Sequence, residues 1–241
     1  MERSLPSWIN ILAILLVAAV FRLYGINWDD GIRAHPDERY IIGVAENLSW
    51  PSQWNPFTCA PNYAYGHLPL YLLAATRGMI QDVDSLILGR ITAALFDLGT
   101  VAMTFVLGRR VHSERTGLLA AAFVALTVLH VQQSHFYTAD GLLGLLVMGT
   151  LFFAVRLAQG GRPVEAWLAG VCAGLALGTK ASAVLLVLPL SAACTLASGR
   201  KRDCIWRVGV SAMVVFALTN PFALVDLPAF SRNVVRQAAI L

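Results

Sequence analysis

Charged residues are scarce in this chain. Asp, Glu, Lys and Arg make up 13% of its 241 residues, whereas a soluble globular domain carries about 25%. Hydrophobic residues make up 57% and lie in long blocks separated by short polar segments. This pattern excludes an ordinary soluble domain and predicts an all-α protein that crosses a membrane several times.

Cysteine is also scarce, and the four cysteines (Cys59, Cys172, Cys194 and Cys204) show no metal-binding spacing. Three of them lie in or beside apolar segments, so we expect small core residues and no disulfide framework. The net charge of +4 comes from basic residues between apolar blocks. Because they do not form one basic face, they argue for membrane orientation and against a nucleic-acid partner.

Seven apolar segments predict transmembrane helices, several of them near the lower length limit for a hydrocarbon core of ~30 Å. They are residues 8–24, 85–108, 116–131, 139–157, 164–178, 181–198 and 204–222. No small-residue cleavage site follows the first segment, so we expect an uncleaved anchor. The shorter run 68–80 contains Arg77 and has the length of an interfacial helix. The positive-inside rule supports this interpretation, because a spanning helix there would move the two most basic loops outside.

With this orientation, polar residues gather at the outer ends of the predicted spans. They include the loop 27–67, Arg90, His130, His135, Asp140, Lys180, Asn220 and Asp226. The inner loops are short and carry mainly positive charge and turn residues. We therefore predict that the functional site faces the outside.

An acidic cluster directly follows the first apolar segment. Asp29, Asp30, Asp37 and Glu38 lie close to the predicted bilayer surface, where carboxylates are costly unless they bind something. The functional interpretation is a general base, or a ligand for substrate or metal. The alternative is a solvated loop that holds the first helix in place.

Further candidates are ionisable or aromatic residues near the outer surface. Arg90 and Lys180 could hold a lipid-linked phosphate, or they could form internal salt bridges, for instance with Asp140 or Asp97. Tyr65 and His67 lie in the segment YAYGHLPLY, which fits either an aromatic belt or a substrate-facing turn. The pair His130 and His135 is weak support for a metal site.

Several of these residues belong to motifs that occur in a fixed order along the chain. The motifs are HPDERY (35–40), NP (55–56), YGHLPLY (65–71), GR (89–90), LGRR (107–110), HFYTAD (135–140) and GLALGTK (174–180). Together they resemble lipid-carrier-dependent GT-C glycosyltransferases. The resemblance is closest to the branch of protein O-mannosyltransferases and the lipid A aminoarabinose transferase.

The resemblance implies a membrane enzyme that transfers a sugar from a polyprenyl-phosphate donor to a hydroxyl of a protein, lipid or glycan, with inversion. It implies that Asp37 is the catalytic base with Glu38 beside it, and that Asp140 lies near the site. Arg90 and Lys180 would bind the lipid phosphate. A divalent metal is compatible with the acids, as some GT-C enzymes use one, but no ligand set is convincing.

Members of this family are usually longer. We therefore expect residues 1–241 to form a single GT-C-like transmembrane domain that lacks a C-terminal part, with interfacial helices in the outer loop 27–84. The short loops favour a bacterial plasma membrane. Two alternatives stay open: a non-catalytic GT-C-like membrane protein, and a transporter or flippase. No inverted repeat is evident, and the charges gather at one face, which disfavours a transporter.

Overall fold

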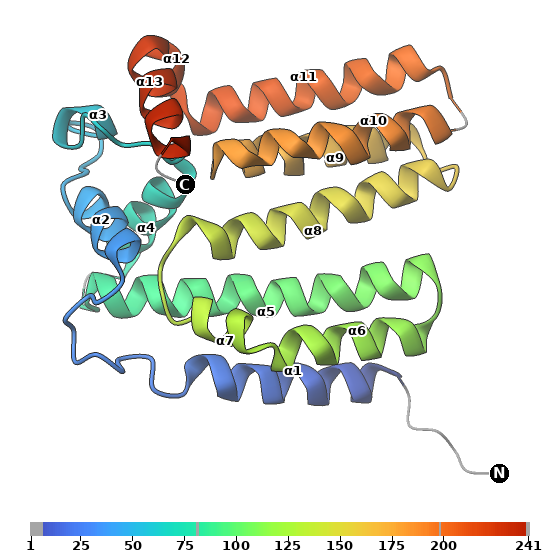
Figure 1. Cartoon of the computed structure of the whole chain (residues 1–241), viewed down its shortest axis with the longest axis horizontal. Coiled ribbons are helices and arrows are strands. Elements are labelled where there is room, and N and C mark those ends of the chain that lie inside the picture. Colours follow the sequence, from blue (N-terminus) through green and yellow to red (C-terminus); the bar gives the residue numbers. More distant parts are fainter. Residues whose placement is uncertain (1–6, 81, 198, 240–241) are drawn as a thin grey trace.

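The computed structural model describes residues 7–80, 82–197 and 199–239, and the regular structure of these residues is helical (Figure 1). Long helices lie side by side along one direction. They are α1 (Ser7–Leu23), α5 (Ser85–Val111), α6 (Glu114–Leu126), α8 (Ala139–Ala158), α9 (Pro163–Leu177), α10 (Val187–Leu196) and α11 (Lys201–Thr219).

The two ends of this bundle differ. At one end, to the right in Figure 1, α5–α6, α8–α9 and α10–α11 turn back through short connections, and we call it the hairpin end. The other, the loop end, gathers most of the short helices. These are α2 (Pro36–Glu46), α3 (Pro56–Cys59), α4 (Leu68–Met79), α12 (Pro221–Val225) and α13 (Leu227–Ala238), while α7 (Val128–Gln133) lies alongside α1 and α5. The predicted helix at 68–80 is therefore present as α4.

The predicted spans and the observed helices agree closely at four segments: α1, α5, α8 and α9. Among the described residues, α5 and α8 are long and apolar enough to cross a membrane, and α1, α9 and the stretch 181–196 are apolar but shorter. The number of seven spans stays a prediction.

Three predicted segments depart from a single straight helix. Segment 116–131 divides at the extended residue Thr127 into α6 and α7. Segment 181–198 begins as a 3₁₀ helix, η1 (Ala181–Leu186), and continues as α10 from Val187; Pro189 has no N–H to donate to the Leu185 carbonyl in the preceding turn. Segment 204–222 ends as α11 at Thr219, since Asn220 precedes Pro221 and leaves the helical region.

Side-chain caps in the sequence define where several helices begin. The Asp84 carboxylate accepts a hydrogen bond from the backbone N–H of Leu86 at 2.7 Å and caps α5. In the same way, the Ser113 hydroxyl caps α6 by accepting from Thr116 N–H at 3.2 Å. These bonds satisfy N–H groups that lack partners within the helix.

Two glycines allow distant segments to join at the loop end. Gly66 N–H donates to Thr179 O and Leu68 N–H donates to Gly178 O, both at 3.0 Å. The side chain of Asn220 accepts from the His67 backbone N–H at 2.7 Å. We call these contacts of residues 66–68, 178–179 and 220 the backbone junction. A Cβ at Gly66 would lie only 1.9 Å from Gly178 O, so the junction requires glycine there.

The prediction that cysteines serve only as core residues is wrong for one pair. Cys194 near the end of α10 and Cys204 near the start of α11 form a disulfide, with Cα atoms 5.5 Å apart. The pair was not predicted because the packing of α10 against α11, which brings the two residues together, is not evident from their spacing of 10 residues. Cys59 and Cys172 are free thiols.

The junction generates a stability prediction. Gly66→Ala forces a methyl group into the Gly178 carbonyl, and backbone cannot move aside as a flexible side chain can. We expect a loss of about 3 kcal/mol or more, measured by thermal or denaturant unfolding in detergent. The matched control is Gly43→Ala, because a Cβ at that site in α2 meets no atom within 4 Å. Unfolding of Gly66→Ala at the wild-type midpoint would contradict the junction.

Candidate functional site

Helix α2 presents two neighbouring carboxylates in different environments. Pro36 starts the helix, and its apolar residues Ile41, Ile42, Val44 and Ala45 are buried. Asp37 and Glu38 lie in the first turn, where negative charge complements the helix dipole. Successive helical residues point about 100° apart, so Glu38 is fully buried whereas Asp37 is half-buried.

Glu38 belongs to a buried ionic cluster centred on Arg90 of α5, which we call the Arg90 bridge. The Arg90 guanidinium donates to Asp29 at 2.8 and 2.9 Å and to Glu38 at 3.0 and 2.8 Å. A fifth bond goes to Ile26 O at 3.0 Å. These bonds use the five N–H donors of an arginine. Hydrogen bonding to Arg90 lowers the pKa of Asp29 well below its ordinary value, against the opposing effect of burial.

The bridge also holds the segment before α8. The second role of the Glu38 carboxylate is to accept a hydrogen bond from the backbone N–H of Tyr137 at 2.9 Å. The Tyr137 hydroxyl in turn donates to Pro69 O in α4 at 2.7 Å. The Arg90 bridge therefore ties α2, α5 and the start of α8 together.

This geometry changes the interpretation of two predicted site residues. Arg90 was expected to face a lipid phosphate, but its side chain is fully buried and its donors are used within the described chain. The alternative of an internal salt bridge is what the structure contains, with Asp29 and Glu38 as partners. Arg90 and Glu38 therefore bind each other within the protein.

The other charged candidates come together at the accessible side of the loop end. Lys180 Nζ donates to Asp140 Oδ1 at 2.7 Å, and both side chains are partly exposed. Lys180 Nζ also lies 5.9 Å from the centre of the Tyr65 ring. Burial, and next the negative charge of the neighbouring Asp37, raise the pKa of Tyr65. We call Asp37, Tyr65, Asp140 and Lys180 the Asp37 cluster.

Different elements contribute each member of the Asp37 cluster. Asp37 comes from α2, Asp140 from the first turn of α8, and Tyr65 from the loop before α4. Lys180 lies at the N-terminus of η1, directly after the backbone junction. Asp37 takes part in no ion pair among the described residues, so its carboxylate is available for proton transfer or ligand binding.

His67 lies apart from this accessible group, inside an aromatic enclosure. Its ring is fully buried, and the ring centres of Phe57 and Tyr71 lie 5.3 and 5.9 Å away. Neither ring nitrogen has a hydrogen-bond partner among the described residues. Burial lowers the pKa of His67 to about 4, so the ring is neutral at pH 7. The predicted contact of His67 with substrate gains no support from this position.

A second ionic cluster lies deeper, between α1, α5 and α7. Asp97 accepts from Arg22 at 2.6 Å and pairs with His130 at 2.6 Å, while Arg22 also donates to Ala125 O at 2.9 Å. Asp97 therefore forms internal salt bridges, but its partners are Arg22 and His130 and not Arg90 or Lys180. Arg22 was not predicted as part of a site, although a charge inside an apolar segment is itself a signal of a buried partner.

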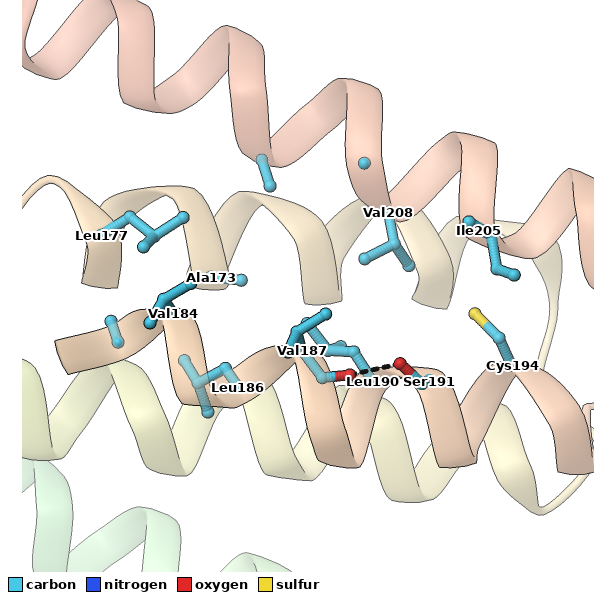
Figure 2. A pocket seen from close by; sticks show the side chains of 13 residues that line it. Ala173, Leu177, Val184, Leu186, Val187, Leu190, Ser191, Cys194, Ile205 and Val208 are labelled. Atoms are coloured by element: carbon cyan, nitrogen blue, oxygen red, sulfur yellow. Dashed lines mark hydrogen bonds between the residues drawn. The ribbon is translucent and has the colours of Figure 1, made fainter. Parts of the chain in front are cut away.

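The described residues contain no group of three or more His, Cys, Asp or Glu side chains placed to hold a metal. An apolar pocket of about 270 Å³ lies elsewhere, between α9, η1–α10 and α11. Figure 2 shows Leu177, Val184, Val187 and Val208 lining it. It contains no ionisable group that could rival the Asp37 cluster.

The Arg90 bridge predicts a large effect of removing its cation. Arg90→Gln leaves two buried carboxylates without a counter-ion, and we expect a loss of about 3–5 kcal/mol in unfolding free energy. The control is Arg33→Gln, which breaks a bidentate pair with Glu46 that is 25–30% exposed; such a pair contributes about 1 kcal/mol or less. Equal losses in the two variants would refute the central position of Arg90.

His67 predicts a pH dependence of stability. Its pKa is about 4 in the fold against 6.5 when unfolded, so its contribution is complete above pH 6.5 and is lost as the pH falls towards 4. The loss reaches about 3 kcal/mol at pH 4. In His67→Phe the melting temperature should fall less between pH 6.5 and pH 4 than it does in the wild type. His112→Phe, at an exposed position, should keep the wild-type dependence on pH. An unchanged slope in His67→Phe would contradict the buried neutral ring.

Two solved structures are similar to this fold. The Archaeoglobus fulgidus oligosaccharyltransferase in its apo form matches with a TM-score of 0.69 and 17% identity, over 98% of this chain and 33% of that chain. The archaeal oligosaccharyltransferase AglB from Archaeoglobus fulgidus, in complex with an inhibitory peptide and a dolichol-phosphate, matches with a TM-score of 0.65 and 16% identity, over 97% and 32%. This chain thus spans about a third of each match, and the likeness confirms the predicted GT-C-like helical fold.

Sequence comparison gives the family. No curated protein matches the chain. The family profile described as dolichyl-phosphate-mannose-protein mannosyltransferase matches residues 68–224, which include Arg90, Asp140 and Lys180. Because this match covers more than half of the chain, the predicted resemblance is confirmed, and the chain belongs to the dolichyl-phosphate-mannose-protein mannosyltransferase family of GT-C glycosyltransferases.

Proposed function

We propose that the chain carries the sugar-transfer site of a membrane glycosyltransferase that uses a polyprenyl-phosphate sugar as donor. The observation that carries the proposal is the Asp37 cluster: Asp37 has no ion pair among the described residues and neighbours Tyr65, and the Lys180 ammonium, paired with Asp140, lies 5.9 Å from the ring of the same tyrosine. Family membership supports sugar transfer as the reaction class. The dolichol-phosphate in the AglB complex supports a polyprenyl phosphate as the carrier.

Lys180 is the proposed ligand of the lipid phosphate. An ammonium group has three N–H donors, and one of them goes to Asp140 in this structure. The others are available for phosphate oxygens. Since Lys180 directly follows the backbone junction, its position is fixed by the contacts of Gly66 and Gly178 and not by a mobile loop.

Asp37 is the proposed general base. It accepts the proton of an acceptor hydroxyl while that oxygen forms a bond to the anomeric carbon and the bond from this carbon to the phosphate oxygen breaks. Attack from the face opposite the phosphate inverts the anomeric centre. The phosphate leaves as an anion stabilised by Lys180, so no second acid has to protonate a leaving oxygen, in contrast to glycoside hydrolysis.

The remaining polar residues of the loop end hold this arrangement. Glu38, next to Asp37, is fixed by Arg90 and by the backbone of Tyr137. A rigid first turn of α2 keeps Asp37 oriented towards Tyr65, and a well-oriented base contributes to rate through its geometry.

We also propose that the chain crosses the membrane several times, with the loop end facing outside. At the hairpin end, basic residues outnumber acidic ones. The basic residues are Arg109, Arg110, Arg115, Arg156, Arg162, Arg200, Lys201 and Arg202, and the acidic residues are Glu114, Glu165 and Asp203. The positive-inside rule then supports an inner location for this end.

Substitution of the base tests the proposal. The purified chain in lipid nanodiscs receives radiolabelled polyprenyl-phosphate sugars and a mixture of protein, lipid and glycan acceptors. Asp37→Asn should lower transfer roughly 10²–10⁴-fold, because the general base is lost while the shape is kept. Asp30→Asn, the same change at an exposed position in the segment before α2, should leave transfer unchanged.

Full activity of Asp37→Asn would remove Asp37 as the base. Absence of transfer in the wild-type chain with every donor would contradict the proposal that this chain alone carries the active site. An equal loss of sugar transfer in Asp37→Asn and Asp30→Asn would indicate that negative charge in this region matters in general, and it would contradict a specific role of Asp37 as the base.

A further inference from the structure

A basic pocket lies at the hairpin end, between the ends of α5 and α8 and away from the loop end. It has a volume of about 510 Å³. Its lining consists of Phe105, Val106, Arg109 and Arg110 from α5 and Phe152 and Arg156 from α8. The Asp37 cluster uses none of these residues, and neither does the Arg90 bridge.

The apolar and basic residues of this pocket have a regular spacing. Each arginine comes four residues after an apolar side chain, in the pairs Phe105 and Arg109, Val106 and Arg110, and Phe152 and Arg156. Residues four apart lie on the same face of a helix, one turn apart. The pocket therefore has basic groups at the helix ends and apolar walls one turn deeper in the bundle.

The charges of the pocket are only partly balanced. Arg156 pairs with Glu165 at 2.6 Å and lies over the Phe152 ring at 5.5 Å. Arg109 and Arg110 are exposed and form no ion pair or side-chain hydrogen bond with another described residue. The dipole at the C-terminus of α5 favours cations there, but it does not account for apolar walls directly beneath them.

We propose that this pocket binds an anionic phospholipid, whose phosphate lies between Arg109 and Arg110 and whose acyl chains lie along Phe105, Val106 and Phe152. A guanidinium forms bidentate bonds with phosphate oxygens, and basic pockets between transmembrane helices suit anionic headgroups. A soluble phosphate would leave the apolar walls without a partner. The inference does not depend on the proposed sugar transfer.

Competitive lipid binding tests this site. The purified chain in detergent receives equimolar dioleoylphosphatidylglycerol and dioleoylphosphatidylcholine, and native mass spectrometry measures the lipids retained. The wild type should retain phosphatidylglycerol preferentially. Arg109→Gln/Arg110→Gln should weaken it ~30-fold, since each basic residue near a lipid headgroup contributes about 1 kcal/mol. Binding of phosphatidylcholine should not change.

The control is Arg200→Gln/Arg202→Gln, which removes the same charge at the same end but outside the pocket, and it should retain phosphatidylglycerol. An equal loss in this control, or no preference in the wild type, would overturn the site. Displacement of the lipid by an equal concentration of glycerol 3-phosphate would overturn the role of the apolar walls. Should Arg109→Gln/Arg110→Gln fail to fold, the single variants Arg109→Gln and Arg110→Gln decide: each should weaken phosphatidylglycerol retention ~5-fold, and unchanged retention in both would refute the phosphate contact.

Discussion

The Arg90 bridge is the interaction on which the loop end depends. One guanidinium, fully buried, binds two carboxylates that are distant from it in sequence, and it thereby fixes the loop after α1 and the first turn of α2 on α5. Burial of such charges is unfavourable unless every donor and acceptor is satisfied. Here the five donors of Arg90 are used, and Glu38 accepts a further bond from Tyr137. The adjacent Asp37 takes its orientation from this cluster while remaining accessible.

As a result of this arrangement, neighbouring residues in the sequence have different environments. Glu38 is held inside and Asp37 is left half-exposed, although both belong to one Asp-Glu pair. A similar relation links Gly178 and Lys180: the glycine permits close backbone contact with Gly66, and the lysine two residues later reaches Asp140. In each pair one residue, Glu38 or Gly178, is constrained by buried contacts. The nearby residue, Asp37 or Lys180, is partly exposed. At the hairpin end, by contrast, Arg109 and Arg110 pair with no described residue and lie one helical turn from apolar side chains.

The sequence predicted much of this structure because its signals are local. Long apolar blocks indicated the helices, and the acidic cluster together with the motifs around Tyr65, Asp140 and Lys180 indicated the members of the Asp37 cluster. The partners of Arg90 could not be predicted, since they depend on how the loop after α1 folds back on α5. The same holds for the Cys194–Cys204 disulfide, which depends on the α10–α11 turn, and for the enclosure of His67, which is built from α3, α4 and α13.

The proposed function requires that the Asp37 cluster receives the phosphate of a polyprenyl carrier. An experimental structure of the protein with a bound polyprenyl monophosphate tests this claim most directly. We predict phosphate oxygens within hydrogen-bonding distance of Lys180 Nζ, on the side of the site that Asp37 faces, with the Arg90 bridge unchanged. A phosphate bound elsewhere, or bound by an Arg90 released from Asp29 and Glu38, would contradict the account.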